Sequence, residues 1–114
     1  MLKSNVDLNN KTVLVTGAAG FIGCNLVKEL LRSFHGVRIV GIDNMNDYYD
    51  VSIKEFRLAE IERVVSESDC QWEFVRGSIA DKALIERIFT EEKPAVVVNL
   101  AAQAGVRYSI TNSP

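Results

Sequence analysis

Short runs of apolar, mostly β-branched residues alternate with longer stretches of helical period along this chain of 114 residues. The short runs cover residues 12–16, 37–42, 71–76 and 95–100, and no two-residue hairpin turn joins them. Strands joined through helices run parallel, because each crossover returns the chain to the same end of the sheet. The pattern therefore predicts one α/β domain with three layers: a parallel sheet of order 3-2-1-4 and helices on both faces.

Three helices are expected between the strands. The first begins at about Phe21 and is predicted to bury Ile22, Leu26 and Leu30, which recur every four residues, and Gly36 follows its end.

The starts of the other two helices carry capping signals. Ser52 and Glu55 fit a capping box, and Asp81 fits the N-cap of a helix that ends before Pro94. The alternation of polar and apolar residues at 71–76 indicates an edge strand, whereas the valine-rich run at 95–100 indicates a strand buried on both faces.

The formal net charge of −2 provides no surplus of cations, which argues against binding to nucleic acid or to an anionic membrane surface. The polar N-terminus lacks the apolar segment of a signal peptide, and no run is long enough to span a membrane, so we expect a cytoplasmic protein. Cys24 and Cys70 have neither metal-site spacing nor disulfide density and are interpreted as buried thiols; no metal site is expected. His35 is interpreted as a surface or capping residue.

A glycine motif stands between the first predicted strand and the first predicted helix. Gly17, Gly20 and Gly23 follow the spacing Gly-x-x-Gly-x-x-Gly, one residue different from the common Gly-x-Gly-x-x-Gly. Gly17 permits the turn, Gly20 permits close approach of a pyrophosphate, and Gly23 permits close packing of the helix. Asp43 follows at the end of the second strand, where a carboxylate can accept hydrogen bonds from ribose hydroxyls. Together these features predict a Rossmann-like dinucleotide site rather than a structural turn alone.

The charge at the ribose position bears on the choice of cofactor. No Lys or Arg occurs between Asp43 and Lys54 to neutralise a 2′-phosphate, so the sequence favours NAD over NADP.

The sequence resembles the extended short-chain dehydrogenases, also called the NAD-dependent epimerase/dehydratase family. The resemblance rests on residues 16–23, 41–44 and 100–103 and extends over nearly the whole chain. Within the family, residues 46–50 and 104–109 look most like the UDP-glucuronate epimerases.

The resemblance implies contacts to the cofactor from the ends of all four predicted strands. The implied cofactor residues are Gly17, Ala19, Gly20, Phe21, Ile22, Gly23, Asp43, Asn44, Ser78, Ile79, Leu100, Ala101 and Ala102. Ser78 stands where the family commonly has aspartate and would offer the adenine an uncharged hydroxyl. Gln103 and Arg107 are the implied substrate residues, Arg107 for a uronate carboxylate or a diphosphate, although a solvated surface arginine is the alternative interpretation.

The resemblance also implies an activity: transient oxidation of a nucleotide sugar by NAD, followed by return of the hydride to the other face. The family uses a tyrosine and a lysine four residues later, yet no tyrosine of this chain is followed by lysine at that spacing. We therefore interpret residues 1–114 as the N-terminal part of an NAD(P)-binding domain whose catalytic and substrate-binding remainder is absent, with no catalytic residue in the chain.

Two alternative functions stay open: a non-catalytic nucleotide-binding module, and a dehydratase or reductase of the same superfamily. A further expectation concerns the strand at 95–100. Because the chain stops at Pro114, we expect the outer edge of this strand to be unpaired and apolar, and we predict that the chain self-associates through it or exchanges its C-terminal segment.

Overall fold

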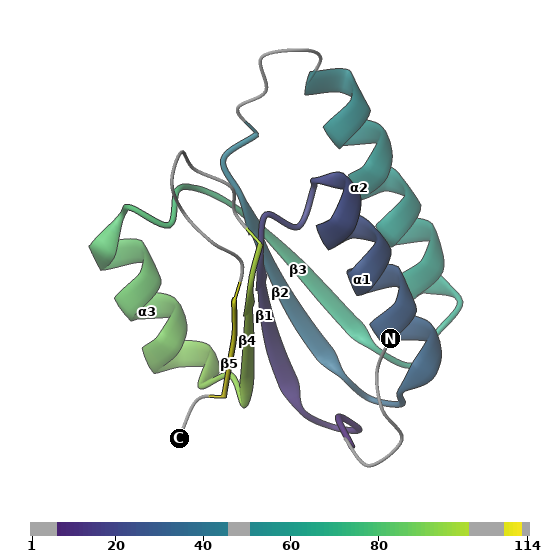
Figure 1. Ribbon diagram of the computed structural model, residues 1–114. Coiled ribbons are helices and arrows are strands. Elements are labelled where there is room, and N and C mark those ends of the chain that lie inside the picture. The colour runs from purple at the N-terminus through teal and green to yellow at the C-terminus, as the bar shows by residue number, and fades with distance from the viewer. Residues whose placement is uncertain (1–6, 46–50, 101–108, 113–114) are drawn as a thin grey trace.

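The computed structural model describes residues 7–45, 51–100 and 109–112 (Figure 1). Its strands and helices, in chain order, are β1 (Thr12–Thr16), α1 (Phe21–Ser33), β2 (Arg38–Asp43), α2 (Val51–Ser66), β3 (Gln71–Arg76), α3 (Lys82–Glu92), β4 (Val96–Asn99) and β5 (Ser109–Asn112).

The strands form one sheet of order β3-β2-β1-β4-β5. β1, β2, β3 and β4 run parallel to one another, which confirms the predicted order 3-2-1-4. The register aligns Thr16 with Ile42 and with Asn99, so the carboxyl ends of β1, β2 and β4 lie side by side. This common edge is where a crevice for a ligand is expected in an open α/β sheet.

The fifth strand corrects the expectation about the outer edge of the sheet. β5 pairs antiparallel with β4, with Ser109 opposite Asn99 and Asn112 opposite Val96. The strand predicted at 95–100 therefore has a partner on each side within the same chain. The premise for self-association through that strand is wrong, because its ladder of backbone hydrogen bonds continues to β5.

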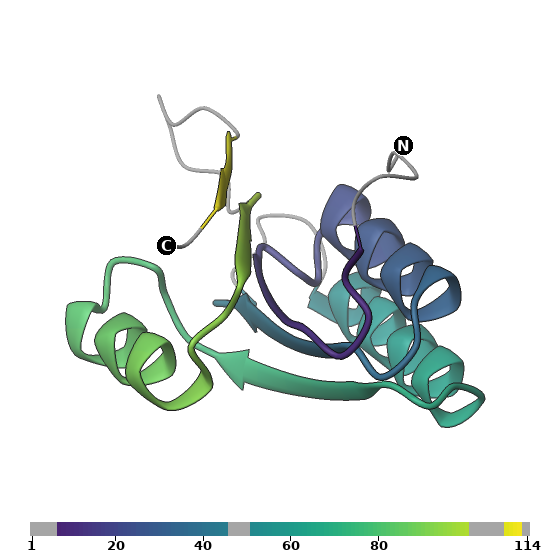
Figure 2. The same cartoon turned by 90° about the horizontal axis from the view of Figure 1, so that it is seen from below.

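Helices cover both faces of the sheet, as predicted (Figures 1 and 2). α1 and α2 pack on one face, where Val13, Val15 and Ile39 point into the larger core. α3 packs on the other face, where Leu14 and Val40 meet Ile88. Alternate residues of β1 thus serve opposite cores, the arrangement expected of a central strand buried on both sides.

Two predictions about burial are wrong. Ile22 is 55% exposed; Leu30 is buried as predicted, and it shares the buried face of α1 with Cys24, Val27 and Leu31. In β4 only Val98 is buried, in the larger core; Val96 and Val97 are half-buried, Val96 against the larger core and Val97 against the smaller one on the opposite face.

The helix starts agree with the capping signals in one case and not in the other. Asp81 caps α3, its side chain accepting a hydrogen bond from the amide of Leu84 at 3.2 Å. α2 instead begins at Val51, which puts Ser52 within the helix rather than at the predicted N-cap.

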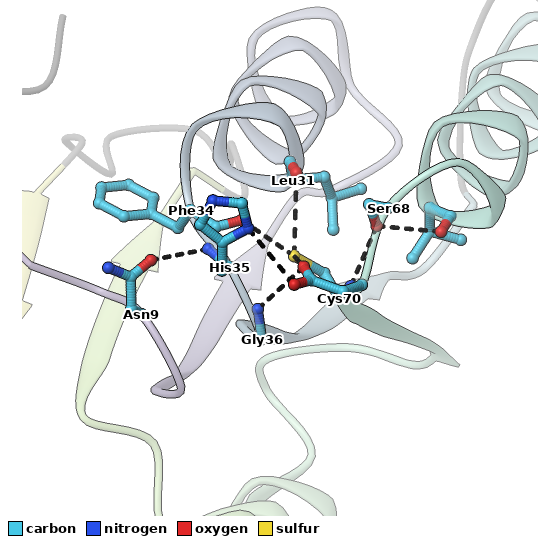
Figure 3. A network of polar contacts seen from close by, with 9 residues as sticks. Asn9, Leu31, Phe34, His35, Gly36, Ser68 and Cys70 are labelled. Carbon is cyan, nitrogen blue, oxygen red and sulfur yellow. Dashed lines mark hydrogen bonds and ion pairs between the residues drawn. The ribbon is translucent and has the colours of Figure 1, made fainter.

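The turn after α1 is held by side chains from other segments (Figure 3). Gly36 has a φ of +66°, and its amide donates to the carboxylate of Asp69 at 3.1 Å. The His35 amide donates to the side-chain oxygen of Asn9 at 2.7 Å, and its exposed ring lies 3.3 Å from Asp69. The Cys70 thiol donates to the carbonyl of Phe34 at 3.2 Å. His35 therefore lies at the surface beside a helix end, as predicted, at the end of the molecule opposite the start of α1.

Candidate functional site

The turn between β1 and α1 has a backbone conformation that requires glycine at its first position. Gly17 has a φ of +69°, in the region that residues with a Cβ rarely adopt. The amides of Gly17 and Ala18 both donate to the carbonyl of Ile42, at 2.7 and 3.1 Å. The turn is therefore anchored to the end of β2, next to Asp43.

Gly20 and Gly23 differ in how tightly they are enclosed. A Cβ on Gly20 would lie 3.3 Å from the Gly17 carbonyl oxygen, a tight but adjustable contact. A Cβ on Gly23 would overlap that same oxygen and lie 3.0 Å from the Cα of Ala18. The third glycine thus permits α1 to approach the turn itself, where the sequence argument had assigned it to helix–sheet packing.

The N-terminus of α1 is open to a ligand. Its N-cap is Gly20, which has no side chain to cap the helix, and the first turn contains no acidic residue. Phe21 is 68% exposed and Ile22 is 55% exposed. The first amides of a helix have no partners within the helix and carry the positive end of its dipole, so this end favours an anion.

Asp43 lies directly against the turn and is 5% exposed. Its Oδ2 accepts the amide of Ala19 at 3.0 Å, and its Oδ1 accepts the amide of Met45 at 2.8 Å. Oδ1 also pairs with the ammonium of Lys54 at 2.9 Å. Asp43 therefore joins the end of β2, the glycine turn and α2.

The contact with Lys54 corrects the electrostatic argument made from sequence. No Lys or Arg lies between Asp43 and Lys54 along the chain, so the sequence predicted an uncompensated carboxylate. In the fold, Lys54 itself returns to the carboxylate, since α2 begins above the carboxyl end of β2 (Figure 1). The preference for NAD thus needs support other than an uncompensated negative charge.

Arg57, one turn after Lys54 on α2, is a second cation at the turn that the sequence did not predict. Its Nη1 donates to the carbonyl of Ala19 at 3.3 Å, and its guanidinium carbon lies 5.9 Å from the centre of the Phe21 ring. Residues three apart share a helix face, so the spacing of Lys54 and Arg57 could have indicated their common direction. Only the fold shows what that face meets.

Cys24 links α1 to α2 by a hydrogen bond. The thiol is buried and donates to the carbonyl of Arg57 at 3.6 Å. Burial raises the pKa of the Cys24 thiol, which keeps it protonated and able to donate. The prediction of a buried thiol is confirmed for this cysteine, whereas Cys70 is half-buried.

The carboxyl ends of β1 and β4 are joined by a polar contact that was not predicted. The hydroxyl of Thr16, which is buried, donates to the side-chain oxygen of Asn99 and accepts the amide of Leu100 at 2.9 Å. Leu100 is half-buried at this edge. Ala101, Ala102, Gln103 and Arg107 lie outside the described residues.

The segment after β3 is tied to the same edge. The amide of Gly77 donates to the backbone carbonyl of Asp43 at 3.1 Å. The Ser78 hydroxyl accepts the amide of Ala80 at 3.0 Å, and both Ser78 and Ile79 are partly exposed. Asn44 is exposed at the end of β2. Every predicted cofactor residue within the described part of the chain therefore lies at the carboxyl edge of the sheet.

In the described part of the chain, no group of three or more His, Cys, Asp and Glu residues is arranged to hold a metal ion. None of the described helices has the length and apolar character needed to cross a membrane.

Comparison with known proteins gives consistent matches. Residues 14–114 match the family model of GDP-mannose 4,6 dehydratase. Protein CapI of Staphylococcus aureus is 46% identical over 100 residues, covering 88% of this chain and 28% of that protein. UDP-glucuronate 4-epimerase 2 of Arabidopsis thaliana is 44% identical over 104 residues, covering 91% of this chain and 22% of that protein.

The fold comparison agrees. The crystal structure of dTDP-glucose 4,6-dehydratase from Bacillus anthracis in complex with NAD superposes with a TM-score of 0.67 at 30% identity, covering 82% of this chain and 27% of that one. The chain thus spans about a quarter of the length of the relatives it matches. On the match to the family model and the agreement in fold, the chain belongs to the extended short-chain dehydrogenases, the family of nucleotide-sugar epimerases and dehydratases.

Proposed function

We propose that this chain is the cofactor-binding part of an NAD-dependent nucleotide-sugar epimerase and that it binds the ADP half of NAD. One observation carries the proposal: the carboxylate of Asp43 lies against the glycine turn, bonded to the amide of Ala19, beside the N-terminus of α1, whose N-cap is a glycine. A ribose acceptor and a pyrophosphate-binding helix end are thereby adjacent, as a dinucleotide requires.

The residues of the turn fit the pyrophosphate. A Cβ on Gly20 or Gly23 would crowd the Gly17 carbonyl, so the turn stays narrow and the start of α1 stays accessible. The proposed pyrophosphate residues are Gly17, Ala19, Gly20, Phe21, Ile22 and Gly23. NAD itself, when bound, accepts and returns a hydride; the residues of this chain bind and orient it.

The remaining proposed contacts follow the edge of the sheet. Asp43 and Asn44 take the adenosine ribose, and Ser78 and Ile79 take the adenine. Leu100 continues the site past β4. The resemblance to the family alone supports Ala101 and Ala102 as cofactor residues and Gln103 and Arg107 as substrate residues.

A titration with matched variants tests NAD binding. NAD and ADP-ribose should bind the chain saturably in calorimetry, whereas nicotinamide mononucleotide should give no measurable heat. Ile22→Glu puts a carboxylate on the exposed first turn of α1, where it should weaken NAD at least about tenfold by repelling the pyrophosphate. Ile53→Glu is the control, because Ile53 is 44% exposed and stands on the first turn of α2.

The titration distinguishes a glycine turn that binds NAD from one that has only a structural role. Equal loss of affinity in both variants would mean that the added charge acts non-specifically, and the pyrophosphate site would be refuted. Absence of binding in a chain whose circular dichroism is that of a folded α/β protein would refute the proposal as a whole.

The substrate we propose is UDP-glucuronate, with inversion at C4 through transient oxidation. Its support is the identity with a UDP-glucuronate 4-epimerase, at 44% over 104 residues. A longer protein containing this chain should convert UDP-glucuronate to its C4 epimer. A dehydrated keto sugar as product would instead assign it to the dehydratases, and conversion of no nucleotide sugar would favour a non-catalytic module.

A further inference from the structure

The pairing of Lys54 with Asp43 changes the charge at the proposed ribose position. The ammonium lies 2.9 Å from Oδ1, and the lysine side chain is 13% exposed. Opposite charges in contact cancel each other's field over distances greater than their separation, and little solvent intervenes to separate this pair. A group approaching the carboxylate therefore meets a nearly neutral pair rather than an anion.

A second cation, Arg57, adds positive charge near this ion pair. Arg57 reaches the carbonyl of Ala19, the residue whose amide donates to Asp43. The next acidic residue on this side of α2, Glu60, is paired with Lys28 of α1 at 2.8 Å. Where the described residues meet at the glycine turn, two cations thus accompany one buried carboxylate.

We propose that Lys54 determines how strongly the site discriminates between NAD and NADP. The inference rests on the proposed function, binding of a nicotinamide dinucleotide with its adenosine ribose at Asp43. An unpaired Asp43 would repel the 2′-phosphate of NADP, whereas the Asp43–Lys54 pair opposes it weakly. Lys54 acts through Asp43, so it is a positioning and charge-balancing residue, and its removal sharpens selectivity for NAD.

The quantity to measure is the ratio of the dissociation constants of NADP and NAD. Lys54→Met should raise this ratio at least about tenfold at low ionic strength, because the uncovered carboxylate then faces the phosphate. Lys54→Arg retains the charge and should leave the ratio within about threefold of the wild type. Lys28→Met is the matched control: it removes an ion pair of similar length between α1 and α2 and should leave the ratio unchanged.

A second measurement needs no variant. In the wild-type chain the ratio should not fall as salt rises from about 0.05 to 0.5 M, since salt screens only an uncompensated repulsion. A ratio that falls steeply with salt would reveal an exposed anionic charge and overturn the inference, even if Lys54→Met did not fold.

The outcomes separate the two proposals. If NAD binds and Lys54→Met leaves the ratio unchanged or lowers it, the role of Lys54 is wrong while NAD binding stands. If neither nucleotide binds the wild-type chain, the proposed function fails and the inference fails with it.

Discussion

Replacing Gly23 with alanine should destabilise this fold although alanine is the better helix former. In an ordinary helix position the change would gain about 0.5–1 kcal/mol. Here the new Cβ would overlap the Gly17 carbonyl oxygen and press on the Cα of Ala18, both of them backbone atoms. Backbone held in a turn cannot rotate away as a flexible side chain can, so α1 must move.

The magnitude follows from the cost of overpacking. Forcing one methyl group into a filled site costs about 1–3 kcal/mol, occasionally more, which exceeds the gain in helix propensity. We therefore expect Gly23→Ala to unfold at lower urea concentration, with a net loss of about 1–2 kcal/mol. Displacement of α1 should also weaken NAD binding.

Urea denaturation followed by the fluorescence of the single tryptophan, Trp72, measures the effect. Gly20→Ala is the control within the same turn, because its Cβ would lie 3.3 Å from the Gly17 oxygen and its φ of −72° suits any residue. That variant should change the free energy of unfolding by less than about 1 kcal/mol. If Gly23→Ala is as stable as the wild type, or if both variants lose the same free energy of unfolding, then a Cβ at position 23 does not collide with the backbone of the turn as inferred.

Three further predictions concern stability away from the turn. Gly41→Ala should cost about 1–3 kcal/mol in urea denaturation, because the new Cβ would collide with the Trp72 ring. Arg38→Met should cost about 1–2 kcal/mol by the same measurement, because it breaks paired contacts of 2.8 and 2.9 Å to Glu92. Asp69→Asn should destabilise the chain at pH 7, and by progressively less as the pH falls below 3.8, the ordinary pKa of an aspartate. The pKa of Asp69 is lowered in the fold, chiefly by the hydrogen bond from a backbone amide, so its contribution is present above its unfolded pKa and lost as pH falls through the folded one.

Each of these has a result that would contradict it. Unchanged stability of Gly41→Ala would mean that the indole ring shifts at little cost. An Arg38→Met variant as stable as wild type would reduce that ion pair to a surface contact. A constant difference between Asp69→Asn and wild type from pH 7 to pH 3 would show that the effect does not come from ionisation.

Local signals predicted most of this architecture. The β-branched run at 12–16 coincides with β1, the alternating run at 71–76 coincides with β3, and Asp81 caps α3 as its side chain and position indicated. The order of the parallel strands followed from the handedness of crossovers, which does not depend on details of packing.

β5 was missed because its signal is weak and its pairing is not local. Its four residues, Ser-Ile-Thr-Asn, contain a single large apolar side chain and resemble a loop. The predicted burial of Ile22 was also wrong. Helical periodicity identifies the apolar face of a helix, but the turn before α1 determines which residues of its first turn reach the core.

The candidate site likewise contains residues that the sequence predicted and contacts that it did not. Gly17, Gly20, Gly23 and Asp43 belong to a motif that is readable along the chain. The contact of Lys54 with Asp43 depends on how α2 packs over the edge of the sheet, and charges counted along the sequence cannot represent it. The hydroxyl contact that joins β1 to β4 likewise links residues more than 80 positions apart.

The most direct test of the account is a nitrogen-15 NMR titration of the chain with NAD. The account predicts saturable shifts centred on the amides of Gly17, Ala19, Gly20 and Gly23 and on Asp43, with the same set moved by ADP-ribose. The amides of the turn at His35 and Gly36, at the opposite end of the sheet, should stay in place. Absence of shifts in a well-dispersed spectrum, or shifts centred away from the glycine turn, would contradict it.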